Sequence, residues 1–250
     1  EIANAEHLAM SESAGMINLS HFAIMDIKGP DTERMLEHLS VAKVGGDTSE
    51  GRIIYTNFLD EDGGVHADLT IARLGEDSYR VITGGADGNR DWVTLRNYRD
   101  DMGLDADINI RTHDVSTLGL WGPQAKEALG HFIDPNEISI ENFPFVGTKN
   151  LTLNLAGGKK IDVWAARISY VGESGWELYL NNDSEEGLAL YDSLLEVGVV
   201  PVGIETYANS RRLEKSFRLQ GADLETEYNA CESAVERPKV KEADFHGKAA

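Results

Sequence analysis

The most constraining feature of this sequence is an internal repeat. Residues 28–39 resemble residues 121–132, which lie 93 positions later and share a Gly-Pro pair, a leucine and a histidine at the same spacing. Residues 63–74 resemble residues 157–168, which lie 94 positions later and share a Gly-Gly pair, an aspartate and an Ala-Arg pair. Because both segments recur in the same order, the sequence predicts two similar units within one chain.

The repeated segments also predict what each unit contains. Pro30 suits the first turn of a helix, and Asp31 or Thr32 can cap it, while a Gly-Gly pair is typical of a turn between strands. We therefore expect an α+β fold in which each unit, about residues 17–110 and 111–218, is an antiparallel sheet with helices on one face. Two such units facing each other are expected to leave a cleft for a small molecule.

Hydrophobic periodicity places the remaining elements. Helices are predicted after Pro30 and over residues 1–13, 87–98, 124–132, 185–197 and 204–217. Strands are predicted in parts of residues 16–27 and over residues 53–59, 65–74, 79–83, 108–115, 117–121, 151–155, 161–170 and 176–180.

Composition excludes several classes of protein. The formal net charge of −20 opposes binding to phosphate backbones, so we expect no nucleic-acid partner. No apolar run is long enough to span a membrane, no signal peptide is visible, and the single Cys231, expected to be buried, fits a reducing compartment. An anionic ligand would need a local basic patch, for which Arg211, Arg212, Lys215 and Arg218 are the dense candidates.

Two segments carry acids that could do chemistry. Residues 167–180 are predicted to form a strand, a tight turn bracketed by Gly172 and Gly175, and a half-buried strand in which Glu177 alternates with apolar residues. By pattern alone, this is a surface hairpin with solvated acids. Asp68 follows a Gly-Gly turn, where a structural and a functional role are equally supported, because Asp162 occupies the same place in the other repeat.

Five sequence blocks in order resemble the glycine cleavage T-protein (aminomethyltransferase) family, and the resemblance covers nearly the whole chain. The resemblance is closest to the folate-binding portion of dimethylglycine and sarcosine dehydrogenases. The most informative block reads Tyr-Val-Gly-Glu-x-Gly-Trp-Glu-Leu over residues 170–178, and the others lie at residues 17–22, 51–70, 120–123 and 212–218.

The resemblance implies roles for individual residues. It makes Glu177 the acid that accepts a forked pair of hydrogen bonds from a pterin ring, and Tyr170 the aromatic wall that stacks on it. It makes Asp68 the acid beside the one-carbon centre and Tyr55 an aromatic neighbour of the folate site. Asp162 is expected to be structural.

For two further residues, a structural role remains as an alternative to a binding role. Arg212 matches an arginine of the family's pocket, although a salt bridge to Glu214 or Glu205 is as well supported. Glu173 falls within the folate signature and is counted with the cofactor-binding residues, although it can also cap the turn.

The resemblance also implies the reaction. We expect tetrahydrofolate-dependent transfer of an aminomethyl or methylene group from a small methylamine-type substrate, giving 5,10-methylenetetrahydrofolate. FAD is expected only in a partner dehydrogenase domain outside this chain. A C-terminal barrel domain is also expected to be absent, because the last residues match the family segment that precedes it. The expected location is the cytoplasm, or the mitochondrial matrix in a eukaryote.

Alternatives to this reading are a glycine cleavage T protein, a related folate-dependent demethylase and, less favoured, a non-catalytic folate-binding regulator. The sequence lacks the Lys-Gly-Cys-Tyr-x-Gly-Gln-Glu motif of the regulator, which argues against it. No metal site is expected, because the seven histidines and one cysteine lack a metal-ligand spacing.

Overall fold

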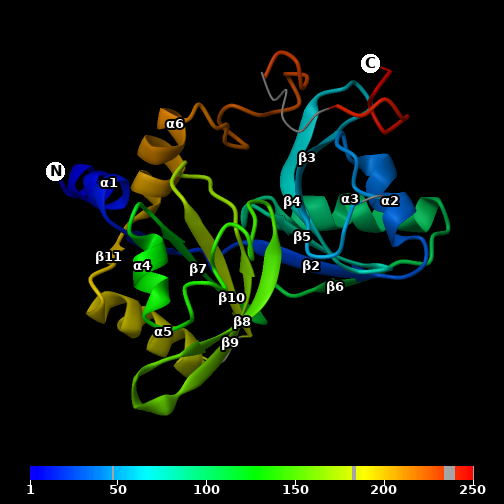
Figure 1. Ribbon diagram of the computed structural model, residues 1–250. Coiled ribbons are helices and arrows are strands. Elements are labelled where there is room, and N and C mark those ends of the chain that lie inside the picture. Colours follow the sequence, from blue (N-terminus) through cyan, green and yellow to red (C-terminus); the bar gives the residue numbers. More distant parts are fainter. Residues whose placement is uncertain (47, 182–183, 234–239, 250) are drawn as a thin grey trace. The chain divides into compact units, whose positions relative to one another are not determined.

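The computed structural model of the protein describes residues 1–46, 48–181, 184–233 and 240–249 (Figure 1). The chain folds into two compact units, each assembled from two stretches of sequence. The first unit comprises Glu1–Ser20 and His113–Phe217, and the second comprises His21–Thr112 and Arg218–Ala250.

The first unit is built on a six-stranded sheet with the order β11-β1-β7-β10-β9-β8, in which β1 and β11 are parallel and the other neighbours are antiparallel. Its strands are β1 (Gly15–Asn18), β7 (Val115–Trp121), β8 (Thr148–Asn154), β9 (Lys160–Ala166), β10 (Gly175–Asn181) and β11 (Val200–Pro201). Its helices are α1 (Ile2–Glu12), α4 (Ala125–Gly130), the 3-10 turn η1 (Ala156–Gly158), α5 (Ser184–Glu196), the π-helix η2 (Thr206–Arg211) and α6 (Arg212–Glu214).

The second unit is built on a five-stranded, fully antiparallel sheet with the order β3-β4-β5-β2-β6. Its strands are β2 (Ala23–Lys28), β3 (Ile53–Leu59), β4 (Val65–Gly75), β5 (Ser78–Thr83) and β6 (Asp107–Ile110). Its helices are α2 (Thr32–Leu39) and α3 (Gly88–Asp101). The predicted α+β class, with two units of antiparallel sheet and helices, is confirmed.

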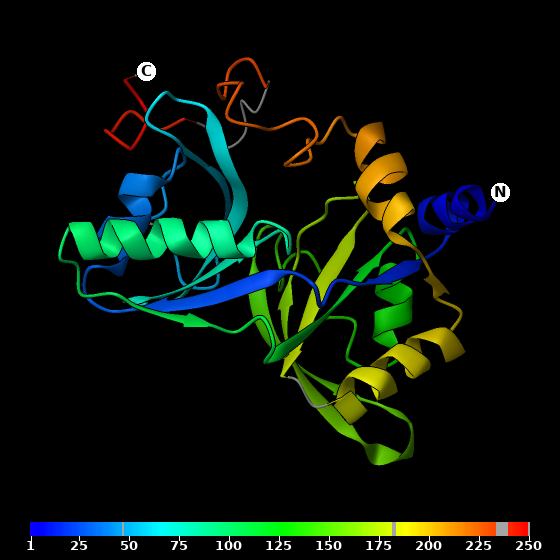
Figure 2. The same cartoon turned by 180° about the vertical axis from the view of Figure 1, so that it is seen from behind.

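Each sheet has one face covered by two helices (Figures 1 and 2). In the first unit, Leu129 of α4 and Leu190 of α5 belong to the same buried cluster as Trp176 and Leu178 of β10. In the second unit, α2 and α3 supply the corresponding cluster, which includes Met35, Leu36, Leu69, Val81 and Leu95. The opposite face of each sheet carries the acids of interest.

Strand register shows that the two units use the same pairings. β7 and α4 follow each other as β2 and α2 do, and Gly122 and Gly29 both stand at the junction with φ of 138° and 146°. A Cβ atom would lie 2.3 Å from the Ser13 carbonyl oxygen at Gly122, and 2.4 Å from the Asp105 carbonyl oxygen at Gly29. The repeated glycine is therefore required by close backbone packing as well as by its dihedral angles.

Three local predictions are wrong. Strand β9 ends at Ala166, so residues 167–174 form an eight-residue loop and not a tight turn. Gly172 has the expected positive φ of 80°, but Gly175 lies within β10, where a Cβ atom would collide with the Leu120 carbonyl oxygen. β10 is buried on both faces rather than half-buried, since six of its seven residues are buried.

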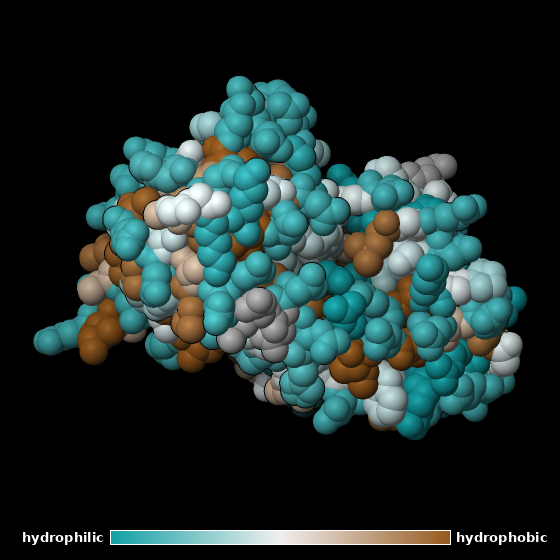
Figure 3. Space-filling model, turned by 90° about the horizontal axis from the view of Figure 1, so that it is seen from below, coloured by the Kyte–Doolittle hydropathy of each residue, from teal (hydrophilic) through white to brown (hydrophobic). Residues whose placement is uncertain are grey.

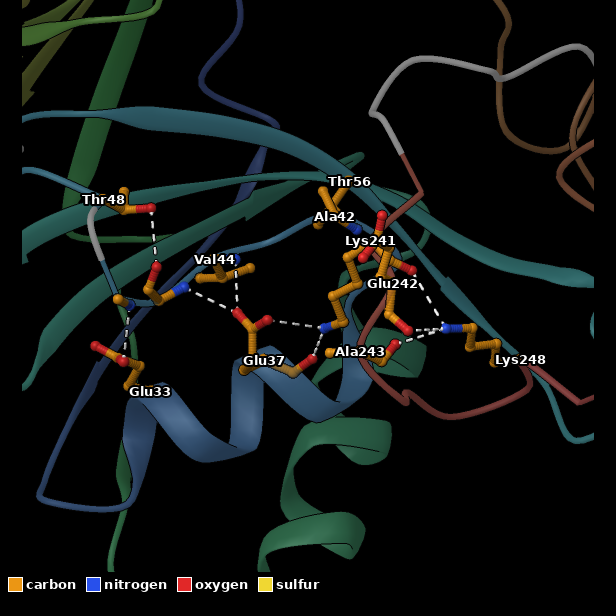
Figure 4. A network of polar contacts seen from close by, with 12 residues as sticks. Glu33, Glu37, Ala42, Val44, Thr48, Thr56, Lys241, Glu242, Ala243 and Lys248 are labelled. Carbon is orange, nitrogen blue, oxygen red and sulfur yellow. Dashed lines mark hydrogen bonds and ion pairs between the residues drawn. The ribbon is translucent and has the colours of Figure 1, made fainter.

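The C-terminal segment of the second unit is fastened to α2 (Figure 4). Lys241 is buried and pairs with Glu37 at 3.2 Å, while Lys248 donates to three carbonyl oxygens of residues 241–243. Phe245 packs in a separate apolar cluster with Val41, Leu59, Val65 and Leu224.

Further corrections concern a cap, a cysteine and a helix. Asp31 is at the start of α2 but makes no capping hydrogen bond there; its carboxylate accepts from the backbone N–H of Asp105. Cys231 is exposed rather than buried. The helix predicted over residues 204–217 ends at Glu214 and contains a π-helical segment, a feature that is frequent at functional sites.

The molecular surface seen in Figure 3 is mainly hydrophilic, with hydrophobic residues in scattered patches. None of the helices in the described part of the chain combines the length and apolar character that crossing a membrane requires.

Candidate functional site

Glu177 is a buried acid on the helix-free face of the first unit's sheet. It is the third residue of β10, only 4% exposed, between Gly119 of β7 and Ala166 of β9. The hydroxyl of Tyr179 donates to its Oε2 at 2.5 Å, and no cation pairs with it within the described residues. Burial raises the pKa of Glu177 to about 7, although the Tyr179 hydrogen bond acts in the opposite direction.

Aromatic rings surround this face of the sheet. Trp121 stands two residues from Gly119, and a Cβ atom at Gly119 would lie 2.1 Å from the Trp121 ring, so the glycine makes room for the indole. From Trp121 the rings continue to Tyr207 of η2 at 5.7 Å between centroids, and then to Tyr170 at 5.2 Å. Tyr170 also stacks on Phe217 at 6.1 Å with an interplanar angle of 15°. An acid beside an aromatic wall suits a flat, polar heterocycle.

The loop of residues 167–174 carries Tyr170 and Glu173, and several contacts hold it. Ser169 Oγ accepts the backbone N–H of Gly172, so Ser169 and not Glu173 caps the turn. The carboxylate of Glu173 instead forms an ion pair with Arg211 at the end of the π-helix. The indole N–H of Trp121 donates to the Ile168 carbonyl oxygen at 2.8 Å.

The two adjacent arginines are both buried, and they do different work. Arg211 pairs with Glu173, whereas Arg212 donates to the carbonyl oxygens of Ala208 and Phe217 and so holds the end of the helix together. Arg218 belongs to the second unit. The predicted basic patch is therefore wrong, because its two central arginines are enclosed and engaged rather than displayed on the surface.

Asp68 is a half-buried acid on the helix-free side of the second unit's sheet. It lies on β4 opposite Asn57 of β3, whose Nδ2 donates to Asp68 Oδ1 at 3.1 Å, and Tyr55 donates a further hydrogen bond. Burial raises the pKa of Asp68 to about 7, and the nearby carboxylates of Asp87 and Asp91 add to the rise while the two hydrogen bonds lower it. A carboxyl group poised near neutrality can either hold or accept a proton.

A polar network that the sequence did not reveal lies behind Asp68. Asp91 of α3 is fully buried, with its Oδ2 accepting from the Thr83 hydroxyl at 2.6 Å and its Oδ1 paired with Arg90 at 3.1 Å. Burial raises the pKa of Asp91 as well. His66 occupies a β-bulge in β4 and contacts Thr94 Oγ1 of the same helix at 3.1 Å.

Acids at equivalent positions of the two units differ in exposure and in hydrogen bonding. Asp162 of β9 faces Thr152 of β8 as Asp68 faces Asn57, but it is exposed and accepts from the Thr152 hydroxyl at 2.6 Å. Arg80 of β5 occupies the register position that Glu177 has in β10.

The charge of Arg80, at the position equivalent to Glu177, is compensated by an acid. Arg80 makes two hydrogen bonds, of 2.7 and 2.9 Å, to Asp26, the residue that Gly119 replaces in the first unit. The two units therefore differ in residue type at the Glu177 position, and in the exposure of the shared aspartate at the Asp68 position. Within the ranges that the structure describes, no cluster of three or more His, Cys, Asp or Glu side chains has the arrangement of a metal site.

The sequence named Glu177, Tyr170, Asp68 and Tyr55 at these positions. It missed Trp121 and Tyr207, the two rings that extend the wall beyond Tyr170, although Trp121 shares the alternation of β7 that places Gly119 on the Glu177 face. No sequence signal distinguishes Arg211 from Arg212, because the π-helix sets which one reaches Glu173.

Comparison with known proteins shows to which family this chain belongs. The model of the GCVT N-terminal domain matches residues 1–238. The chain belongs to the glycine cleavage T-protein family.

Relatives of two kinds share this sequence. An aminomethyltransferase of Herpetosiphon aurantiacus is 31% identical over 92% of this chain and 60% of its own length. The mitochondrial dimethylglycine dehydrogenase of Homo sapiens is 34% identical over the whole of this chain and 28% of its own length, and that of Rattus norvegicus is 34% identical over 98% of this chain. The chain thus spans less than two thirds of these relatives.

Solved structures confirm the fold. The glycine cleavage system aminomethyltransferase T of Bartonella henselae superposes with a TM-score of 0.84 at 22% identity, covering 99% of this chain and 64% of that one. A chain of the heterotetrameric sarcosine oxidase from Corynebacterium sp. U-96 superposes with a TM-score of 0.52 at 15% identity, covering 81% of this chain and 95% of that one.

Proposed function

We propose that this chain binds tetrahydrofolate and transfers a one-carbon unit to it, giving 5,10-methylenetetrahydrofolate. Glu177 accepts two hydrogen bonds from the amino group and ring N–H of the pterin, and Tyr170 stacks on the ring. Asp68, with Tyr55 beside it, orients folate and takes up the proton that a folate nitrogen releases as it bonds to the one-carbon unit. Arg212 supports the pocket by fixing the end of the helix that carries Tyr207.

The observation that carries this proposal is Glu177, a buried acid without a cation in a setting rich in aromatic rings. An uncompensated buried carboxylate is costly, and perturbed acids of this kind cluster at functional sites. A pterin supplies the two donors that Glu177 lacks and a flat surface for the aromatic wall.

The donor of the one-carbon unit is proposed from the relatives. The dimethylglycine dehydrogenases match 98–100% of this chain, against 92% for the aminomethyltransferase of Herpetosiphon aurantiacus. This favours a small methylamine-type substrate, oxidised by a flavin domain of the same full-length protein, over the aminomethyl donor of glycine cleavage.

Calorimetric titration with tetrahydrofolate tests the pterin site. The unaltered chain is expected to bind, and Glu177→Gln is expected to weaken binding by roughly ten- to one-hundred-fold, because hydrogen bonds to a charged group contribute about 1.5–3 kcal/mol. Glu137→Gln is the matched control, since Glu137 is an exposed residue of the same unit that pairs with Lys149. Equal affinities for the two variants would contradict the role of Glu177.

Asp68 is tested by turnover in the full-length protein that carries this sequence. Asp68→Asn is expected to abolish formation of methylenetetrahydrofolate while folate still binds. Asp162→Asn is the matched control at the equivalent repeat position and is expected to leave turnover unchanged. Normal rates in the Asp68 variant would show that this acid does not act in the reaction.

A further inference from the structure

Glu173, three residues after Tyr170, is paired with an arginine, although its place in the folate signature suggests that it binds the ligand. Glu173 lies in the same loop as Tyr170, yet its carboxylate is paired with the Arg211 guanidinium through Nη2. The Arg211 side chain is only 6% exposed, and that of Glu173 is 23% exposed. An ion pair so enclosed is screened weakly by solvent and has a defined geometry.

A histidine of the N-terminal helix completes the cluster. The second terminal nitrogen of Arg211, Nη1, lies 3.1 Å from Nε2 of His7 in α1. His7 Nδ1 lies 3.0 Å from Ser210 Oγ, and that hydroxyl donates to the Thr206 carbonyl oxygen at 3.4 Å.

The directions of these hydrogen bonds follow from the donors available. Arginine can only donate, so Nε2 of His7 must accept. Because the hydroxyl proton of Ser210 is directed at Thr206, Nδ1 of His7 donates to Ser210 Oγ. His7 therefore accepts from Nη1 of the guanidinium, while Glu173 accepts from Nη2.

The same π-helix holds the aromatic wall. Tyr207, four residues before Arg211, contacts both Tyr170 and Trp121. Tyr207 and Arg211 of η2 therefore contact the loop at Tyr170 and at Glu173, respectively. The aliphatic stem of Lys215, just after the helix, passes over Gly172, where a Cβ atom would lie 2.3 Å from it. The loop is thus clamped at Tyr170, Gly172 and Glu173 by residues of one short segment.

We propose that Glu173, Arg211 and His7 form a latch that fixes the loop of residues 167–174 and thereby positions Tyr170 against the pterin. This inference rests on the proposed function and refines it: Glu173 is a positioning residue and does not itself contact folate. Tyr170 has no regular secondary structure to hold it, so the affinity for the pterin depends on the latch.

The latch is tested first without ligand, by hydrogen exchange of the backbone amides in residues 167–174. Arg211→Gln and Glu173→Gln are each expected to speed exchange in this loop while leaving β7 and β9 protected. Arg211→Lys, which keeps the charge, is expected to restore part of the protection. Exchange in the loop at the unaltered rate in both glutamine variants would overturn the proposal.

Folate binding and turnover then show whether the latch positions Tyr170. Both glutamine variants are expected to raise Kd and KM about ten-fold with kcat at saturating folate unchanged, whereas a general loss of structure would lower the active fraction and hence kcat. The double variant is expected to bind folate no more weakly than either single variant, because each single substitution already removes the contact between Glu173 and Arg211. Glu137→Gln is the exposed control in the same unit.

The outcomes separate this inference from the proposed function. Additive effects of the two substitutions on Kd, or an unchanged Kd in a chain that binds folate, would overturn the latch and leave the proposed function standing. If the unaltered chain does not bind tetrahydrofolate, the proposed function and the positioning role both fail, and hydrogen exchange still decides whether the loop is latched.

Discussion

Replacement of Glu177 by glutamine is expected to make the first unit more stable at neutral and alkaline pH. Burial raises the pKa of this carboxyl from 4.5 to about 7 in the folded protein. Between these two values the folded chain binds a proton that the unfolded chain does not. Stability contributed by Glu177 is therefore present below pH 4.5 and is lost as the pH rises through 7.

The magnitude follows from the size of the shift. A difference of 7 − 4.5, or 2.5 pKa units, corresponds to about 3 kcal/mol of unfolding free energy between the acid and alkaline limits. Between pH 5.5 and pH 8, which keeps the protein away from its isoelectric point of about 4.6, the expected change is about 2 kcal/mol. Glutamine is neutral throughout and still accepts the Tyr179 hydroxyl, so the variant lacks this pH dependence.

The assay is urea unfolding followed by tryptophan fluorescence. Three of the four tryptophans, Trp121, Trp164 and Trp176, lie in the first unit, so the signal reports mainly on the unit that contains Glu177. Many other carboxyl groups titrate in both proteins, and the quantity of interest is therefore the difference between the two stabilities at each pH. Glu137→Gln supplies the baseline for an exposed glutamate.

The expected result is a stability difference that grows by about 2 kcal/mol in favour of Glu177→Gln from pH 5.5 to pH 8. A pH-independent offset added to this growth would be explained by new contacts of the amide. Parallel pH profiles for the variant and the unaltered chain would show that Glu177 is not the strained acid that its burial indicates.

Three further predictions follow from the same site and its scaffold. Folate binding near pH 6 should release a proton from Glu177, because the pterin donors favour its charged form; calorimetry in buffers of different ionisation enthalpy measures the release, which should vanish at pH 8.5 and in Glu177→Gln. Gly119→Ala should destabilise the first unit by about 1–3 kcal/mol and weaken folate binding, because the added Cβ displaces the Trp121 ring; urea unfolding and calorimetry measure the two effects. Gly122→Ala should cost about 1–3 kcal/mol of stability without changing the pKa of Glu177, as measured by the pH dependence of unfolding.

Most of the elements could be predicted from the sequence because their hydrophobic periods are clear. Strands such as β3 and β4 and helices such as α3 and α5 lie within a few residues of their predicted bounds. The loop of residues 167–174 could not be predicted, since its glycines suggest a short turn. Its length is set by the pairing of Glu177 with Ala166, which only the assembled sheet determines.

The candidate site was predicted less completely, and for a different physical reason. Alternation along β10 suggested a half-buried strand, but the chemistry of Glu177 depends on what covers its second face. The Trp121 ring, which lies over Gly119 on that face, contacts Tyr207, and Tyr207 lies 30 residues beyond Glu177 in the chain. Likewise, the residues alone could not separate Asp68 from Asp162, because their burial depends on tertiary packing.

The duplicated fold supplies an argument that neither unit provides alone. At one register position the second unit pairs Arg80 with Asp26 by two hydrogen bonds, a compensated arrangement that satisfies both charges. In the first unit, Glu177 stands in place of the cation and Gly119 in place of its acidic partner, and the Trp121 ring occupies the space over Gly119. A sheet under selection for stability alone has no need of an uncompensated acid there, since the neighbouring unit shows that the fold accepts a satisfied pair. The uncompensated burial of Glu177 therefore supports the proposal that this position binds a ligand with two hydrogen-bond donors.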